Sequence, residues 1–209
     1  SKKGKILVLD LGANIECNEK NLVEFAEMGS ALYKSLFPEK IINLSILNIG
    51  TEEIKGTEVI KKTITHLKEL SKLGDFNFKG SIEGNKIMDG ESNVIVTDGF
   101  TGNIALKTAE GTAKLFQNHL NDAFRSSILS KLGYFLSSLA MKSVKDRLDP
   151  RVHNCGILMG LNSLAVKCHG QSEYRGVSYA ADIIYSLLEN NVNEKIQHYV
   201  HEIQSKVMN

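Results

Sequence analysis

The sequence predicts a layered α/β/α fold built on a mostly parallel sheet, with a helical hairpin inserted into it. Short apolar runs at 6–9, 46–49 and 94–96 lack the alternation of half-exposed strands, as expected when both faces of a parallel sheet are covered. Amphipathic helical stretches separate these runs. A chain that alternates strands with helices in this way forms right-handed crossovers in a layered fold.

The expected strands are short apolar runs bounded by turn-forming residues. They span Lys5–Asp10, Ile41–Ile49, Phe76–Lys79, Val94–Asp98, Cys155–Met159 and Leu164–Cys168. Two helices are predicted: one over Asn21–Leu36, between the first and second expected strands, and one over Glu58–Leu70, between the second and third. Both repeat apolar residues near the 3.6-residue period of a helix, and the second carries lysine and glutamate on its other face.

The stretch from Gly111 to Arg151 has no strand signal and predicts helices interrupted at Gly133. We interpret it as a helical hairpin, inserted at about 112–150 into one α/β domain that spans 1–209. Between 120 and 151, six basic residues stand against three acidic ones. The hairpin therefore carries a local positive charge on a chain that is close to neutral.

Composition argues against several classes of protein. The 209 residues carry 25 Lys and Arg against 24 Asp and Glu, and a net charge of +1 argues against a nucleic-acid binder. The three cysteines form no CxxC pair, which is typical of cytosolic proteins, and no apolar run reaches 18 residues. The chain opens at Ser1 directly into a strand without Met, so we expect further polypeptide ahead of it.

The loops that follow the strands are the first candidates for a site, because ligands bind beyond the carboxyl ends of parallel strands. The most informative loop has the sequence DGFTGN from Asp98 to Asn103, where we expect a tight turn before a helix begins. Gly99 and Gly102 would let the backbone approach a ligand closely. Thr101 is a residue type that caps helices, and the exposed N–H groups at a helix N-terminus bind anions. An ordinary capped strand-to-helix turn explains the same residues.

A second loop, from Asn48 to Gly56, contains Gly50 and Lys55. It does not match a P-loop, because its last glycine follows the lysine, and no GxGxxG follows a strand. Kinase-like and hydride-transfer activities therefore lack their usual sequence support. Lys55 would place a cation beside a strand end, although a solvated first helical turn is the simpler interpretation.

Cysteine and histidine residues in the last third of the chain give no metal or nucleophile pattern. Cys168 and His169 are neighbours at the end of an expected strand, so their side chains point to opposite faces and are poorly placed for a dyad. We interpret Cys168 as a small buried residue and His169 as a polar site residue. His153 and Cys155 lack metal-ligand spacing, so no metal site is predicted.

Six segments taken together resemble the bacterial phosphate acyltransferases of the PlsX family. They read KILVLDLGANIEC at 5–17, FAEMGS at 25–30, LNIGTEEIKG at 47–56, EGNKIMDG at 83–90, DGFTGNIALKTAEG at 98–111 and GILMGLNSLAVKCHG at 156–170. The resemblance implies an architecture like that of isopropylmalate dehydrogenase and phosphotransacetylase. It also implies an enzyme in which inorganic phosphate attacks the thioester of a fatty acyl-carrier protein. The product, an acyl phosphate, feeds phosphatidic acid and phospholipid synthesis.

The implied reaction gives roles to the candidate residues. We predict that Asn103, Lys107 and His169 are catalytic. The residues predicted to bind phosphate and substrate are Asn14, Gly50, Lys55, Asp98, Gly99, Thr101 and Gly102. Because a pantetheine thiolate leaves readily and phosphate is already a dianion, the chemistry requires no covalent enzyme intermediate, cofactor or metal.

The resemblance is incomplete at the start of the chain. Family members begin with an α/β region that contains an Asp-x-Met-Gly-Gly-Asp strand end and a Gly-Asn-Thr-Gly-Ala loop, and this sequence has neither. We therefore expect the chain to be the C-terminal portion of the enzyme, and to be weak or inactive by itself. The alternatives are a coenzyme A-dependent, phosphotransacetylase-like acyltransferase, a decarboxylating dehydrogenase, or a non-catalytic fragment that docks a carrier protein or a membrane.

The resemblance also implies a cytoplasmic homodimer that attaches peripherally to the membrane, through the hairpin or through the downstream membrane acyltransferase. The hairpin has apolar residues flanked by Lys131 and Lys142, which suits an anionic surface. These apolar residues are Leu132, Tyr134, Phe135, Leu136 and Leu139. A helix pair at a dimer interface is an equal alternative, and both can hold.

Overall fold

The computed structural model describes residues 1–73, 76–148, 155–168 and 174–208. Contacts divide the chain into two compact units. The first unit comprises Ser1–Ala105, Met159–Leu164 and Tyr185–Asn209, and the second comprises Leu106–Leu158 and Ala165–Ile184. The sequence-based division, one domain with a hairpin at about 112–150, stays a prediction.

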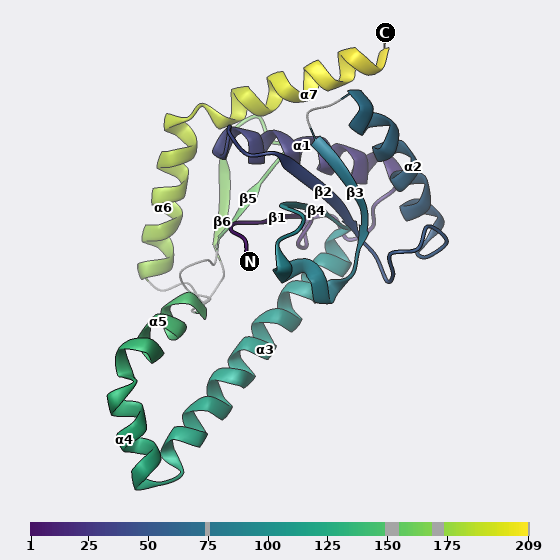
Figure 1. Cartoon of the computed structure of the whole chain (residues 1–209). Helices are drawn as coiled ribbons and strands as arrows, with labels where there is room; N and C mark the ends of the chain where they lie inside the picture. The colour runs from purple at the N-terminus through teal and green to yellow at the C-terminus, as the bar shows by residue number, and fades with distance from the viewer. Residues whose placement is uncertain (74–75, 149–154, 169–173, 209) are drawn as a thin grey trace. The chain divides into compact units, whose positions relative to one another are not determined.

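The first unit contains a four-stranded sheet in which every pairing is parallel (Figure 1). Its strands are β1 (Leu7–Leu9), β2 (Ile42–Leu47), β3 (Phe76–Ile82) and β4 (Val94–Val96), in the spatial order β1-β4-β2-β3. Ile95 of β4 pairs with Val8 of β1 on one side and with Ser45 of β2 on the other. The four strands coincide with four of the predicted apolar runs, so the parallel sheet is confirmed.

The larger hydrophobic core packs one face of this sheet against the helices α1 (Glu19–Leu36), α2 (Glu58–Leu73) and α7 (Val192–Met208). Val94 and Val96 of the central strand β4 are completely buried on this face. The helices contribute Leu22, Phe25, Ala26, Tyr33, Ile64, Leu67, Leu70 and Ile203. Amphipathic helices that bury their apolar stripe against a sheet are the expected covering layer of this fold class.

The opposite face of the sheet has a smaller core around Ile95, which is also completely buried. Ile95 clusters with Leu47, Ile82 and Ile87, the last from the short 3₁₀ helix η1 (Gly84–Asp89). Ala105, from the helix α3 (Gly99–Arg125), packs against the same cluster. Helical segments therefore cover both faces, and the predicted layered α/β/α class is confirmed.

Local signals set the ends of α1. Asn18 caps the helix: its Oδ1 accepts from the N–H of Asn21 at 3.0 Å, and Asn21 Oδ1 accepts from the N–H of Asn18 at 3.1 Å. The helix consequently begins two residues before the predicted Asn21. It ends at Leu36, because the residue that precedes Pro38 is sterically disfavoured in helical conformation.

The second unit contains most of α3, followed by α4 (Ile128–Leu136) and α5 (Ser138–Leu148). It also holds an antiparallel pair of strands, β5 (Cys155–Leu158) and β6 (Ala165–Cys168), and most of the helix α6 (Tyr174–Glu189). These two strands were expected from their apolar runs. In the part of the chain that the structure describes, they pair with each other and form a sheet separate from the parallel one.

The helical breaks of this unit differ from the prediction. Gly133 lies inside α4, and the breaks fall at 126–127 and at Ser137. Ser127 forms the N-cap of α4, where its Oγ accepts from the N–H of Ser130 at 3.0 Å. A glycine inside a helix costs only about 1 kcal/mol relative to alanine, so the serine caps decide where the helices stop.

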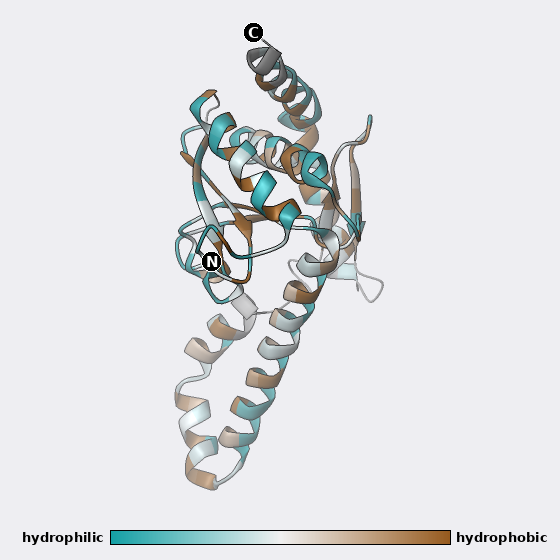
Figure 2. Cartoon of the chain, turned by 90° about the vertical axis from the view of Figure 1, so that its right-hand side faces the viewer, coloured by the Kyte–Doolittle hydropathy of each residue, from teal (hydrophilic) through white to brown (hydrophobic). Residues whose placement is uncertain are grey.

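The helices α4 and α5 carry apolar residues, coloured brown in Figure 2, and several of these are exposed. Ile128 is 85% exposed, Leu136 77% and Leu139 85%. An edge-on contact between the rings of Phe124 and Tyr134, with centroids 5.2 Å apart, joins α3 to α4. Across the described part of the chain, every helix is too short or too polar to span a bilayer.

Candidate functional site

Polar side chains follow the parallel strands at the carboxyl edge of the sheet. Asp10 comes directly after β1, Asn48 directly after β2, and Asp98 follows β4 by two residues. Backbone hydrogen bonds extend the ladder into this region, from Asp10 N–H to the carbonyl of Thr97 at 2.8 Å and from Asn48 N–H to that of Ile82 at 2.9 Å. The loops singled out from the sequence therefore start at one edge of the sheet.

The Asp10 carboxylate organises the loop after β1. Its Oδ1 accepts from the N–H groups of Gly12 at 2.8 Å and Ala13 at 2.9 Å. Its Oδ2 accepts from the N–H of Asn14 at 2.7 Å and from Asn14 Nδ2 at 2.9 Å. Asp10 is only 8% exposed, and burial by itself would raise its pKa. The four hydrogen bonds outweigh burial and hold the pKa of this carboxyl below its usual range.

The helix α3 begins at Gly99, which corrects the predicted turn over Asp98–Asn103. The N–H of Gly99 donates to the carbonyl of Asn14 at 2.8 Å, and a Cβ atom at position 99 would lie 2.5 Å from the same oxygen. A Cβ atom at Gly102 would lie 3.0 Å from the carbonyl carbon of Asp10. Both glycines therefore admit the backbone of the loop after β1. The sequence instead predicted that these two glycines let the backbone approach a ligand.

Asp98 caps the start of α3. Its Oδ1 accepts from the N–H of Thr101 at 2.8 Å, its Oδ2 accepts from the Thr101 hydroxyl at 2.8 Å, and its carbonyl accepts from the N–H of Gly102 at 2.9 Å. With the bond from Gly99, three N–H groups of the first helical turn thus have acceptors within the protein. An anion at this edge must therefore be held mainly by side chains, as in the capped-turn interpretation of the sequence.

Asn14 lies in the loop after β1, and Asn103 borders the same loop. Both residues are exposed. A Cβ atom at Gly12 would lie 3.5 Å from Cβ and Cγ of Asn103, so the Asn103 side chain borders this loop directly. Gly12 has a φ of +126°, in a region that residues with a Cβ rarely adopt. The two amides, one of them fixed by Asp10, are exposed polar groups of the candidate site.

The loop after β2 is shaped by the buried side chain of Asn48. Its Nδ2 donates to the carbonyl of Lys55 at 3.2 Å and to Ser81 Oγ at 3.1 Å, while its Oδ1 accepts from the N–H of Ile49 at 2.8 Å. Gly56 has a φ of +91°, and a Cβ atom there would lie 2.5 Å from Asn48 Oδ1. The loop that carries Lys55 is therefore tied back to the strand end.

Lys55 supplies an exposed cation to this edge. In the described ranges its ammonium forms no ion pair. Glu53, by contrast, is paired with Lys68 of α2, whose hydrogen bond and charge lower the pKa of the glutamate. Gly50 is buried beside the stem of Lys55, where an added Cβ atom would lie 3.0 Å from Lys55 Cγ.

The remaining predicted residues are not assembled with these. Lys107 belongs to the second unit, where it forms an ion pair with Glu110 at 2.7 Å. His169 and His153 lie outside the described residues. Cys168, expected to be buried, is half-buried at the end of β6.

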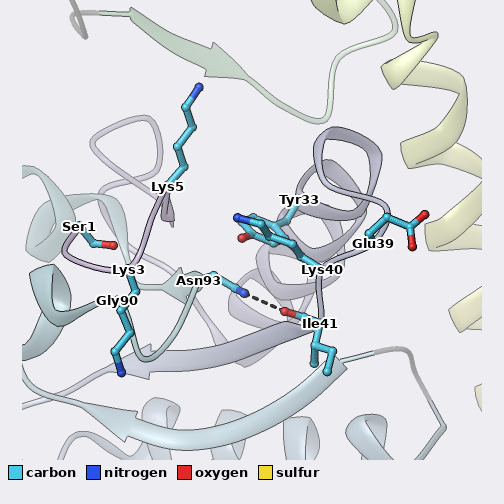
Figure 3. Close-up of a pocket in the computed structure, with 9 residues that line it drawn as sticks. All are labelled: Ser1, Lys3, Lys5, Tyr33, Glu39, Lys40, Ile41, Gly90 and Asn93. Carbon is cyan, nitrogen blue, oxygen red and sulfur yellow. Dashed lines mark hydrogen bonds between the residues drawn. The ribbon is translucent and has the colours of Figure 1, made fainter.

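A cavity of about 400 Å³ lies elsewhere in the first unit, where the chain enters the strands (Figure 3). Asn93 precedes β4 and donates from its Nδ2 to the carbonyl of Ile41, which precedes β2, at 2.8 Å. The cavity is lined by Ser1, Lys3, Lys5, Tyr33, Glu39, Lys40, Ile41, Gly90 and Asn93. None of these residues was a sequence-based site candidate.

Asp10 and Asn48 are organising residues that the sequence-based site omitted. Asp10 directly follows the apolar run Ile6–Leu9, and Asn48 directly follows Ile46 and Leu47 at the end of β2. A polar residue in this place, at the end of an expected strand, is the signal that could have identified them. Hydrogen bonds from their side chains fix the loops that carry Asn14 and Lys55.

Comparison with known proteins identifies the family of this chain. The profile of a family described as "Fatty acid synthesis protein" matches residues 1–195. The chain belongs to this family. The family resemblance drawn from the sequence is thereby confirmed.

Relatives of this chain include three curated proteins named phosphate acyltransferase. That of Pelagibacter ubique is 48% identical over 200 residues, that of Paramagnetospirillum magneticum 44% over 195, and that of Rhodospirillum rubrum 43% over 202. The matches cover 96%, 93% and 97% of this chain, but 60%, 55% and 57% of the relatives. The chain therefore spans little more than half the length of the curated relatives it matches.

Proposed function

We propose that this chain is part of an acyltransferase that forms an acyl phosphate from a fatty acyl-carrier protein and inorganic phosphate, for phospholipid synthesis. The observation that carries the proposal is the family match over 1–195, with relatives named phosphate acyltransferase. That name supports acyl transfer involving phosphate. The carrier-protein donor, the acyl phosphate product and the activity itself belong to the proposal.

In the proposed reaction, a phosphate oxygen attacks the thioester carbonyl carbon and forms a C–O bond. The C–S bond then breaks, and the pantetheine sulfur leaves as a thiolate that takes up a proton. Phosphate is already a nucleophilic dianion and the thiolate is a good leaving group. The protein therefore needs mainly to align the two reactants and to stabilise the oxyanion of the tetrahedral intermediate.

We assign the first contacts with the reactants to Asn14 and Asn103. Their amides are exposed at the carboxyl edge of the sheet and add no negative charge there. Asp10 and Asp98 do carry negative charge at this edge, so a phosphate dianion requires a nearby cation. At a separation of 4 Å and an effective dielectric constant near 20, one cation offsets one such repulsion by about 4 kcal/mol. Lys55 is the proposed cation of the first unit.

Lys107 and His169 stay proposed charge partners on the strength of the sequence resemblance. Lys107 would first have to leave Glu110, an exposed pair of the kind that contributes at most about 1 kcal/mol. Breaking such a pair costs little compared with binding a dianion. The ion pair between Lys107 and Glu110 in the free protein is therefore compatible with a role of Lys107 in catalysis.

The second proposed activity is peripheral membrane attachment through α4 and α5. Ile128, Leu129, Leu136 and Leu139 are each at least 77% exposed, which is unusual for one short stretch of a chain. Lys131 and Lys142, on the same helices, are also exposed and suit an anionic lipid surface. The same apolar surface supports the alternative that a second copy of the chain covers it in a homodimer.

The test of the acyltransferase proposal is phosphate-dependent thiol release. A fatty acyl-carrier protein and the matching acyl-coenzyme A are compared as donors, with the Pelagibacter ubique relative as positive control, and acyl phosphate is trapped with hydroxylamine. We expect release above the buffer rate that requires phosphate, is faster with the carrier protein, and is slower than with the relative.

Each other outcome contradicts one part of the proposal. Faster release from coenzyme A contradicts the carrier-protein donor. A rate equal to that of the relative contradicts the expectation that this chain is weak by itself. Thiol release at the same rate with and without phosphate contradicts the proposed reaction. No release, together with binding of the acyl-carrier protein, supports a non-catalytic docking role in its place.

A further inference from the structure

Two of the three cysteines face each other across the antiparallel pair β5–β6. In its register, Cys155 lies directly opposite Cys168, and the two Sγ atoms are 3.6 Å apart. Both thiols are free and half-buried, and both belong to the second unit. Cys17, the third cysteine, belongs to the first unit.

The backbone already holds this pair at the separation that a disulfide requires. Directly opposite residues of antiparallel strands have Cα atoms about 4.5 or 5.5 Å apart, depending on the type of pair. Disulfides bridge Cα atoms that are about 4.4 to 6.8 Å apart, with sulfurs at about 2.05 Å. Both types of pair fall within that range. Side-chain rotation is therefore enough to close the 3.6 Å gap between the sulfurs.

We propose that Cys155 and Cys168 are an oxidisable dithiol that closes into a disulfide across β5–β6 when it meets a low-molecular-weight disulfide such as oxidised glutathione. This is a proposed modification site of the second unit. It does not depend on the proposed function.

The reaction is thiol–disulfide exchange in two steps. Cys168 loses a proton, and its thiolate attacks one sulfur of glutathione disulfide, which forms a mixed disulfide and releases one glutathione thiolate. Cys155 then loses a proton and attacks Cys168 Sγ, which forms the protein disulfide and releases the second thiolate. The two cysteine sulfurs are oxidised, the two glutathione sulfurs are reduced, and each released thiolate takes up one proton.

The order of the two steps follows from the surroundings of Cys155. Burial, the hydrogen bond with Cys168 and the charge of that residue raise the pKa of Cys155 to about 11. Very little of it is therefore thiolate at neutral pH, and only the thiolate attacks. Cys155 is suited to act second, when Cys168 Sγ is already part of a mixed disulfide and carries no charge.

Metal binding is a weaker explanation of this pair. A structural zinc site needs four ligands, commonly cysteine and histidine. No group of three candidate ligands gathers anywhere in the parts of the chain that the structure describes. The Cys155 thiol contacts the carbonyl of Gly176 in α6 at 3.7 Å, so disulfide formation would exchange this weak contact for a covalent link within the β5–β6 pair.

The experiment treats the reduced, chelator-washed chain with oxidised glutathione, then alkylates it and maps its peptides by mass spectrometry. We expect the mass to fall by two hydrogens and the peptides of Cys155 and Cys168 to be joined. Alkylation of these two cysteines should fall at least about tenfold, while Cys17 stays alkylated, since exchange is selective for paired and accessible thiols. The Cys17→Ser variant is the matched control and should form the same disulfide.

The single variants test the order of the steps. In the Cys155→Ser variant we expect the reaction to stop with one glutathionyl group on Cys168, and the Cys168→Ser variant should react at least about tenfold more slowly. Circular dichroism shows whether each variant is folded. Bridges that involve Cys17, dimers linked between chains, or unchanged alkylation of Cys155 and Cys168 in the wild-type chain would overturn the proposal. None of these outcomes bears on the acyl-transfer assay.

Discussion

Gly102 of α3 packs directly against the carbonyl group of Asp10, the residue that follows β1. A Cβ atom at position 102 would lie 3.0 Å from the carbonyl carbon and closer still to its oxygen. The N–H of Gly99, one turn earlier, donates to the carbonyl of Asn14 at 2.8 Å. The contact between α3 and the loop after β1 therefore depends on two positions without side chains, and it sets the place of Asn103 beside that loop.

Replacing Gly102 with alanine should lower the free energy of unfolding by about 2 kcal/mol or more, because the new methyl group overlaps backbone that cannot rotate away. The matched control is Gly111→Ala in the same helix, where an added Cβ atom has nothing within 4 Å. That change should raise stability by about 0.5–1 kcal/mol through helix propensity. Urea unfolding measures both. Equal effects of the two substitutions would contradict the packing argument.

The Asp10→Asn substitution should lower the free energy of unfolding by about 2 kcal/mol at pH 7, because a charged acceptor of four hydrogen bonds is lost. The pKa of Asp10 is lower in the folded chain than its ordinary value near 3.9, so ionisation favours the folded state. This stabilisation is complete above that ordinary value and is lost as pH falls through the folded-state pKa.

The difference in unfolding free energy between wild type and Asp10→Asn should therefore be constant between about pH 7 and pH 5, and shrink below about pH 4. Urea unfolding at several pH values measures it. Glu16→Gln, which removes an exposed charge from the same segment, is the control and should change stability by less than about 0.5 kcal/mol. If the difference in unfolding free energy between wild type and Asp10→Asn grew as the pH was lowered, ionised Asp10 would not be what stabilises the folded chain.

Replacing Asn103 or Lys107 with alanine should lower acyl phosphate formation by at least about tenfold with the fold intact, since each is proposed to stabilise charge in the reaction. Lys114→Ala removes another exposed lysine of α3 and should leave the rate unchanged. Thiol release measures the rate and circular dichroism the fold. A residue whose replacement leaves the kinetics unchanged has no part in the site.

The double variant Leu136→Glu, Leu139→Glu should lose binding to anionic vesicles, because it replaces two of the most exposed apolar side chains of the hairpin with charges. Ser138→Glu, Ser143→Glu adds the same charge to exposed positions of α5 without removing apolar surface, and should weaken binding much less. Vesicle flotation measures binding, and light scattering measures the oligomeric state. Loss of a dimer with vesicle binding retained would favour a dimer interface in place of membrane attachment.

The parallel sheet was predictable because its strands contain short apolar runs, such as Val94–Val96 in the central strand β4, and strands covered on both faces keep such runs. The start of α3 was not predictable in the same way. Two glycines and a threonine within GFTGN are local signals for a turn, yet Gly99 and Gly102 lie in a helix because their missing side chains admit the backbone after β1. A contact between segments about ninety residues apart in sequence outweighs the local propensity.

The sequence by itself determined the class of fold, the positions of its strands and first two helices, and the family, because these depend on periodicity and on segments read along the chain. Tertiary structure decided which acceptor satisfies each N–H group at the strand ends. Asp10 and Asp98 take hydrogen bonds that a bound anion would otherwise receive, and Cys155 meets Cys168 across two strands. Such pairings depend on distances in space between residues, and a pattern along the chain does not encode those distances.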